Sequence, residues 1–160
     1  MGKIYTEIQE ELTIEAPVDL VWHAWTLSDR VSQWFAPEAT IEAKEGGKYE
    51  LYFIPGNELN MNTKGCKVIR LIPEQELVFQ WKGPDQFNPL MNNNDELTTV
   101  SIRFEKMDAE TKVLLRHDGF KEGTAWSEAL QWHQMAWSGV LKSLKNALEK
   151  GKGELCCQPE

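Results

Sequence analysis

A single long amphipathic segment near the C-terminus, residues 124–150, constrains the fold more than any other part of the sequence. Apolar residues recur along it three and four positions apart, which is the spacing of one helix face. About 25 residues at the standard rise give a helix of roughly 37 Å. Such a helix has to bury its one wide apolar stripe against another element. The stripe contains Trp126, Ala129, Leu130, His133, Ala136, Trp137, Val140, Leu141, Leu144, Ala147 and Leu148.

An antiparallel sheet is the element predicted to cover this stripe. Residues 4–14 place apolar side chains at positions of one parity, which is the period of a half-buried strand. After the Gly46-Gly47 turn, several segments are rich in β-branched and aromatic residues. Pro, Gly, Asn and Asp separate them, mostly over short connections, which predicts hairpins. These predicted strands are residues 48–54, 65–72, 76–81, 97–106 and 111–120.

Two short helices are predicted between the first strand and the Gly46-Gly47 turn. Residues 18–27 follow Pro17 with apolar residues at helical spacing, and Ser28 is placed to cap a second helix over 29–35. The longest separator, 83–96, is polar and rich in Asn. We expect it not to pack, to be the most mobile loop, and to lie over an opening.

The predicted fold class is therefore α+β, with a curved antiparallel sheet of about six or seven strands wrapped around the long C-terminal helix. One domain over residues 1–152 is expected, followed by a flexible tail over 153–160. A sheet curled over a cylinder seldom closes tightly, so a gap between helix and sheet is the candidate binding site. The candidate ligand-binding residues are Trp34, Phe53, Phe79, Trp81, Ile102, Phe104, His117, Trp126, Leu130, His133 and Trp137.

Composition and charge exclude several classes of partner. The formal net charge of −8, without a large Lys/Arg cluster, disfavours nucleic acid. The N-terminus alternates polar and apolar residues instead of forming a signal peptide, and no run approaches the roughly 18 apolar residues that span a bilayer. We expect a cytoplasmic monomer without membrane insertion.

The histidines are the residues with the greatest capacity for acid–base chemistry or ligand contact. His133 lies on the apolar stripe of the C-terminal helix, where it can contact a ligand or serve as a satisfied core residue. His117 and Asp118 resemble an acid/base pair, but neighbours on a strand point to opposite faces, so a turn at Asp118-Gly119 is the simpler interpretation. The three histidines are scattered, and no metal, cofactor or catalytic constellation is predicted.

Several segments together resemble one known family. They are EAPVDLVWHAWTLSDRVSQWFAP, GGKYEL, KVIRLIPEQELVFQW, TKVLLRHDGF and HQMAWSGVLKSLKNAL, which run in the right order over nearly the whole chain. The family is the START-like, SRPBCC superfamily, and within it the branch named after the activator of the ninety-kilodalton heat-shock protein ATPase. The resemblance implies a helix-grip fold. Ala136 stands where many relatives have Gly, and its methyl group crowds whatever approaches the helix there.

Three functions follow as hypotheses from this resemblance. Relatives hold hydrophobic or amphipathic small molecules in the cavity, act as cyclases or dehydratases, or bind a heat-shock chaperone and stimulate its ATPase. The aromatic lining and the lack of a catalytic constellation favour non-catalytic binding of a small molecule over an enzyme. A co-chaperone role and a cavity enzyme using His133 or His117 are the alternatives.

Overall fold

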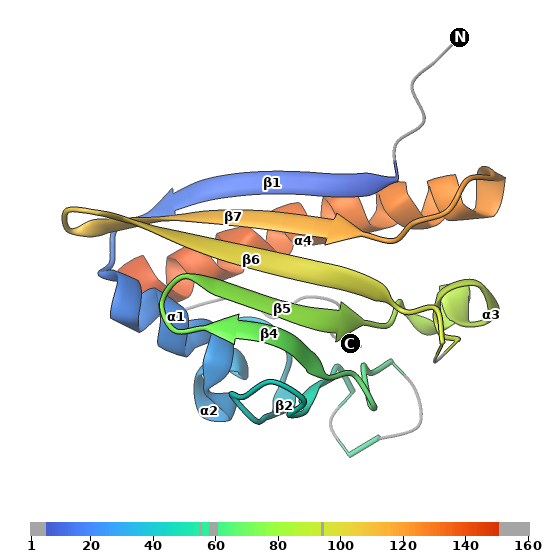
Figure 1. Cartoon of the computed structure of the whole chain (residues 1–160), viewed down its shortest axis with the longest axis horizontal. Helices are drawn as coiled ribbons and strands as arrows, with labels where there is room; N and C mark the ends of the chain where they lie inside the picture. The colour runs from blue at the N-terminus through green and yellow to red at the C-terminus, as the bar shows by residue number, and fades with distance from the viewer. Residues whose placement is uncertain (1–5, 55, 58–60, 94, 151–160) are drawn as a thin grey trace, which may run out of the picture.

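The structure is a computed structural model that describes residues 6–54, 56–57, 61–93 and 95–150 (Figure 1). Predicted features at the two ends, Ile4 in the first strand and the tail 153–160, lie outside the described residues. The helices are α1 (Val18–Thr26), α2 (Ser28–Val31), η1 (Asp85–Phe87), α3 (Asn88–Met91) and α4 (Thr124–Lys150). The strands are β1 (Glu7–Ile14), β2 (Glu38–Ile41), β3 (Tyr49–Tyr52), β4 (Val68–Ile72), β5 (Glu76–Trp81), β6 (Thr98–Met107) and β7 (Glu110–Asp118).

The strands form two antiparallel sheets that continue into one another. The larger sheet has the order β1-β7-β6-β5-β4, and the smaller one pairs β2 with β3. An isolated bridge between Lys48 and Lys67 joins them, and the N–H of Tyr49 donates to the carbonyl of Cys66 at 2.9 Å. The predicted meander is confirmed for β4 to β7, where each strand pairs with the next. The strand β2 was not predicted, because four residues with alternating exposed and half-buried side chains carry little apolar signal.

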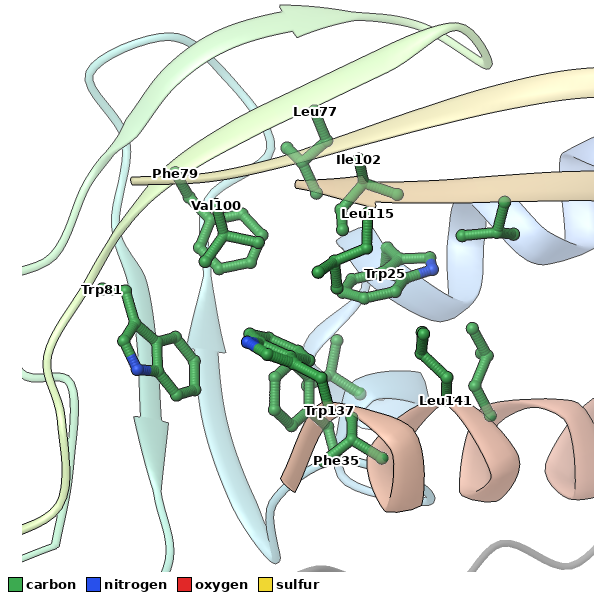
Figure 2. Close-up of a cluster of buried hydrophobic side chains, with 14 of the residues drawn as sticks. Trp25, Phe35, Leu77, Phe79, Trp81, Val100, Ile102, Leu115, Trp137 and Leu141 are labelled. Atoms are coloured by element: carbon green, nitrogen blue, oxygen red, sulfur yellow. The ribbon is translucent and has the colours of Figure 1, made fainter. Parts of the chain in front are cut away.

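Helix α4 lies along one face of the five-stranded sheet, with α1 and α2 at one end of the molecule (Figure 1). Its buried side chains include Trp126, Leu130, Trp137, Leu141 and Leu144, the apolar stripe seen in the sequence. Side chains of β5, β6 and β7 point toward this stripe in Figure 2. The predicted helix-grip arrangement of one sheet around one long helix is confirmed.

The end of α4 is fixed to β1 by polar contacts. Lys145 donates from Nζ to the carbonyl of Thr13 at 2.6 Å, and Glu149 accepts the N–H of Glu15 at 2.7 Å. Lys145 and Glu149 also form an ion pair one helical turn apart. These contacts set the position of the helix along the sheet, and so determine which residues of α4 face the end of β5.

The second predicted helix is shorter than expected. Instead of running over 29–35, α2 ends at Val31 and the chain continues in turns to Phe35. Ser28 is the first helical residue and not the cap, because its hydroxyl accepts the N–H of Ile41 at 2.9 Å. Ending the helix early places Trp34 and Phe35 in the core as a stacked pair.

The turn that leaves β7 supplies a testable feature of this fold. Gly119 has a φ of +95°, and a Cβ at this position would lie 3.2 Å from the Cα of Thr98. Replacing Gly119 by Ala is therefore expected to destabilise the protein by about 2–3 kcal/mol in urea unfolding. Gly46 has a φ of +81° but nothing within 4 Å of the added Cβ, so G46A should lose only about 1 kcal/mol. Equal losses in both variants would contradict the contact with Thr98.

Candidate functional site

Three buried aromatic rings from distant parts of the chain form one wall of a cavity between α4 and the sheet. Trp81 is the last residue of β5, Trp137 lies on α4, and Phe35 follows α2. Phe35 and Trp81 are stacked with ring centroids 5.9 Å apart, and Trp137 lies 5.2 Å from Trp81 and 5.6 Å from Phe35. Figure 2 shows Trp81 and Trp137 facing each other from the two elements.

The rest of the cavity wall comes from α4 and from two loops. Trp132 and Ala136 are half-buried and occupy one flank of the helix stripe, while Met61 and Pro84 belong to the loops before β4 and after β5. The full lining consists of Phe35, Phe53, Met61, Asn62, Trp81, Lys82, Gly83, Pro84, Trp132, His133, Ala136, Trp137 and Val140. The wall is thus mainly aromatic and aliphatic.

The cavity is narrow inside and open at its mouth. The centres of water molecules can occupy only about 30 Å³, whereas the hollow measures about 470 Å³ when space between atoms and open solvent are counted. The smaller volume determines which molecules fit, because the larger volume includes space outside the protein. The smaller volume corresponds to about two water molecules.

His133 accepts a hydrogen bond from the indole N–H of Trp81 inside this wall. Its Nδ1 lies 2.7 Å from the carbonyl of Ala129, an acceptor, so Nδ1 carries the proton. The unprotonated Nε2 then accepts the N–H of Trp81 at 3.1 Å. His133 is 1% exposed and uses both ring nitrogens within the protein.

His117 does the same for the indole of Trp137. Its Nδ1 accepts the N–H of Trp137 at 3.0 Å, so the proton is on Nε2, which donates to the hydroxyl of Thr98 at 2.8 Å. The Thr98 hydroxyl in turn lies 3.5 Å from the carbonyl of Trp81. The two histidine rings are 5.3 Å apart, so they form one buried group with the two indoles.

Both histidines are held neutral by their surroundings. Burial lowers the pKa of His117 well below its usual value, and the neighbouring His133 lowers it further. Burial also lowers the pKa of His133 to about 4, although its hydrogen bond with Ala129 acts in the opposite direction. Both nitrogens of each ring are engaged in hydrogen bonds within the protein.

The loop after β5 packs against the cavity, contrary to the expectation for 83–96. The side chain of Asn92 accepts the N–H of Gly83 at 2.8 Å and donates to its carbonyl at 3.0 Å, which ties the two ends together. Phe87 contacts the rings of Trp132 and His133, and Met91 is fully buried. The polar composition of this loop led to the wrong expectation that it does not pack, because one asparagine closes the loop and a few apolar residues anchor it. Its mobility stays a prediction.

The candidate residues named from the sequence divide into two groups. Phe53, Trp81, His133 and Trp137 line the cavity. The other seven do not line it, but lie buried in the core around it. They are Trp34, Phe79, Ile102, Phe104, His117, Trp126 and Leu130.

Contacts within the core explain why several of these seven lie away from the cavity. Phe79 stacks on Tyr49, Phe104 meets the edge of Trp22, and the indole N–H of Trp34 donates to the carbonyl of Ala24. Whether any of the eleven residues binds a ligand stays a prediction.

Sequence reasoning missed the residues that border the mouth. Met61, Asn62 and Pro84 come from loops, whose course has no periodic signal. Trp132 lies four positions before Ala136 on the flank of the helix stripe, so a wider stripe would have included it; Ala136 was part of the predicted stripe but not of the candidate ligand-binding residues. The crowding expected at Ala136 falls on the cavity itself.

The strand β7 ends at Asp118, and Gly119 follows with a positive φ; His117 is fully buried, whereas Asp118 forms an ion pair with Arg116. Within the described residues, no group of three or more His, Cys, Asp or Glu side chains converges as a metal site. None of the helices in that part of the chain has both the length and the apolarity needed to cross a membrane.

Comparison with known proteins confirms the resemblance to one branch of the superfamily. The family of Activator of Hsp90 ATPase homolog 1-like proteins matches residues 15–149, which is most of the chain. Among curated proteins, no significant sequence match was found.

Solved structures with low sequence identity share the fold. The solution structure of the Aha1 dimer from Colwellia psychrerythraea is 24% identical, with a TM-score of 0.72, and the match covers 93% of this chain and 100% of that one. The protein MLL2253 from Mesorhizobium loti is 16% identical at a TM-score of 0.72, over 90% and 97% of the two chains. CalU16 from Micromonospora echinospora is 22% identical at 0.64, over 89% and 74%.

Proposed function

This chain belongs to the family of Activator of Hsp90 ATPase homolog 1-like proteins, and on that premise we propose that it is a cytoplasmic, monomeric protein that binds a hydrophobic or amphipathic small molecule. The observation that supports this most is the aromatic cavity formed by Phe35, Trp81 and Trp137 between α4 and the sheet. Aromatic walls with few polar groups are typical of sites for apolar ligands.

Binding requires the cavity to widen, because about 30 Å³ does not hold an organic ring. The wall includes side chains that can move at modest cost. Met61 is an unbranched side chain on a loop, and the half-buried Trp132 has an indole N–H with no hydrogen-bond partner among the described residues. We therefore place ligand entry at the mouth between the loops and α4.

Thermal unfolding against a panel of small molecules tests the proposal. The panel contains fatty acids, sterols, flavonoids and polyketide-like aromatics. A ligand at about 100 times its Kd should add about 2.7 kcal/mol, which corresponds to a rise in Tm of roughly 5–10 °C for a chain of this length. One chemical class raising the Tm while the others do not would support a selective cavity.

A blocking variant and a matched control connect the shift to this cavity. Ala136 lines the wall, so A136F should fill the space and abolish the ligand-induced rise in Tm. Ser138 is exposed on the same helix, so S138F should keep the rise. If no compound shifts the wild-type Tm, or if A136F responds like S138F, small-molecule binding at this site is wrong.

Association with a heat-shock chaperone is the second candidate function. It is supported by the family description and by the net charge of −8, which suits a basic partner surface. Pull-down from host lysate at low salt should recover the chaperone if this candidate is right. Loss of the chaperone at higher salt would fit a charge-driven contact, and no recovery at low salt would count against it.

A further inference from the structure

Two of the three indole donors that line the cavity, those of Trp81 and Trp137, are already used by the protein. Trp81 donates its N–H to Nε2 of His133 at 3.1 Å, and Trp137 donates its N–H to Nδ1 of His117 at 3.0 Å. An indole N–H in an apolar wall would otherwise be the natural donor for an acceptor atom on a ligand. The two histidines therefore remove the two donors that the inner wall could offer.

The histidine rings offer no free donor or acceptor to a ligand either. The remaining nitrogen of His133 faces the carbonyl of Ala129 at 2.7 Å, and that of His117 faces the hydroxyl of Thr98 at 2.8 Å. These partners fix opposite tautomers, with the proton on Nδ1 of His133 and on Nε2 of His117. No ring nitrogen of the pair is left to meet a ligand.

The backbone groups of two loop residues that line the cavity, Gly83 and Met61, also have partners within the protein. Gly83 uses both its N–H and its carbonyl on the side chain of Asn92. The N–H of Met61 donates to Asp85, and the carbonyl of Met61 accepts the N–H of Phe53. Peptide groups at a cavity edge often bind polar ligands, and those of Gly83 and Met61 are occupied.

We propose that the site selects ligands whose buried end carries neither a donor nor an acceptor, such as an unsubstituted hydrocarbon ring, and that His117 and His133 set this specificity by accepting the indole N–H groups of Trp137 and Trp81. The inference rests on the proposed function, since it concerns the same cavity. Any polar part of the ligand then lies toward the mouth. Asn62, Lys82 and the half-buried indole of Trp132 are the other polar side-chain groups of the lining.

The selectivity has a physical cause and an expected size. A polar atom pushed into this wall loses its hydrogen bonds to water and finds no partner, which is worth roughly 10- to 100-fold in affinity. If one histidine is replaced by an apolar residue, the indole N–H of its tryptophan partner becomes a free donor in the wall. The preference should then shift toward ligands with an acceptor.

Naphthalene and quinoline test this shift, because they have nearly the same shape and differ in one acceptor nitrogen. Their Kd values are measured by fluorescence titration on the wild type and on H133F. The ratio of the two Kd values should shift toward quinoline by at least ~10-fold in H133F. H23F is the matched control, since His23 is exposed on α1, and it should keep the wild-type ratio.

A reciprocal variant covers the case in which H133F does not fold. W81F removes the donor and leaves Nε2 of His133 as a free acceptor, so indole should gain at least ~10-fold over naphthalene relative to the wild type. A third measurement needs no variant. Nitrogen NMR of the wild type should find His133 protonated on Nδ1 and His117 protonated on Nε2.

The outcomes separate this inference from the proposed function. One outcome is that naphthalene binds the wild type while the folded variants H133F and W81F show the same ratios of Kd values between ligands as the wild type. In that case the histidines do not set specificity and the inference is overturned, while the binding function stands. Equal tautomers in the two histidines would overturn it as well. If none of the three probes and no member of the panel binds the wild type, the proposed function fails and the inference fails with it.

Discussion

Lowering the pH from 7 to 5 is expected to destabilise the folded protein by about 2 kcal/mol through His133 alone, with His117 adding to the loss. Burial lowers the pKa of His133 to about 4 and that of His117 well below its usual value. The unfolded chain binds a proton at each histidine below about pH 6.5, but the folded chain does not. Stability is therefore fully present above that pH and falls as the pH drops from about 6.5 toward 4.

Urea unfolding followed by tryptophan fluorescence at pH 7, 6 and 5 measures this slope. Each histidine contributes up to about 1.4 kcal/mol per pH unit within the window. H133Q keeps a polar side chain that does not titrate. The free energy of unfolding of this variant should therefore fall less steeply with decreasing pH, by the contribution of one histidine. H23Q, at an exposed position on α1, should retain the wild-type slope. A wild type equally stable at pH 7 and pH 5 would show that the buried histidines become protonated without cost.

The long helix and its cover could be predicted from the sequence because both depend on periodicity. The stripe of α4 repeats at helical spacing over seven turns, and β5, β6 and β7 alternate in the period of half-buried strands. Each pattern identifies the face that must be buried. A sheet and a helix with one apolar face each leave few arrangements open.

The hydrogen bonds between histidines and tryptophans could not be predicted in this way. Trp81 and His133 are 52 positions apart in the chain, and Trp137 and His117 are 20 apart. Their pairing depends on the register of β5 against β6 and of β6 against β7, and on how far α4 extends along the sheet. A change of register by one residue would turn Trp81 or His117 to the outer face. The sequence identified His133 as a stripe residue but not its partner.

The size of the cavity was equally beyond reach of the sequence. A gap between helix and sheet follows from the architecture, but its volume depends on where Phe35 lies after α2 ends early. Periodicity predicts a longer helix there. The early end places a ring against both Trp81 and Trp137, which narrows the gap. The remaining space holds about two water molecules.

Replacing Trp137 by Ala is expected to lower the free energy of unfolding by about 3–5 kcal/mol. Trp137 is 2% exposed, contacts the rings of Phe35 and Trp81, and donates its N–H to His117. Its loss leaves a void and also leaves Nδ1 of His117 without a partner. At this chain length the Tm should fall by roughly 10 °C or more.

Trp132 on the same helix is the matched control for this prediction. Its side chain is half-buried, contacts Phe87 and His133, and forms no hydrogen bond with the described residues, so W132A should cost only about 1–2 kcal/mol. Similar losses in the two variants would show that the network of indoles and histidines adds nothing to stability.

The W132A variant also tests how a ligand enters the cavity. Trp132 lines the cavity and is partly exposed, so removing it widens the mouth while the hydrogen bonds of Trp81 and Trp137 remain. W132A should therefore bind naphthalene faster than the wild type does, with the same preference over quinoline. Stopped-flow fluorescence measures the association rate. A rate unchanged by W132A would place the entry elsewhere, with the loop that Asn92 closes as the next element to test.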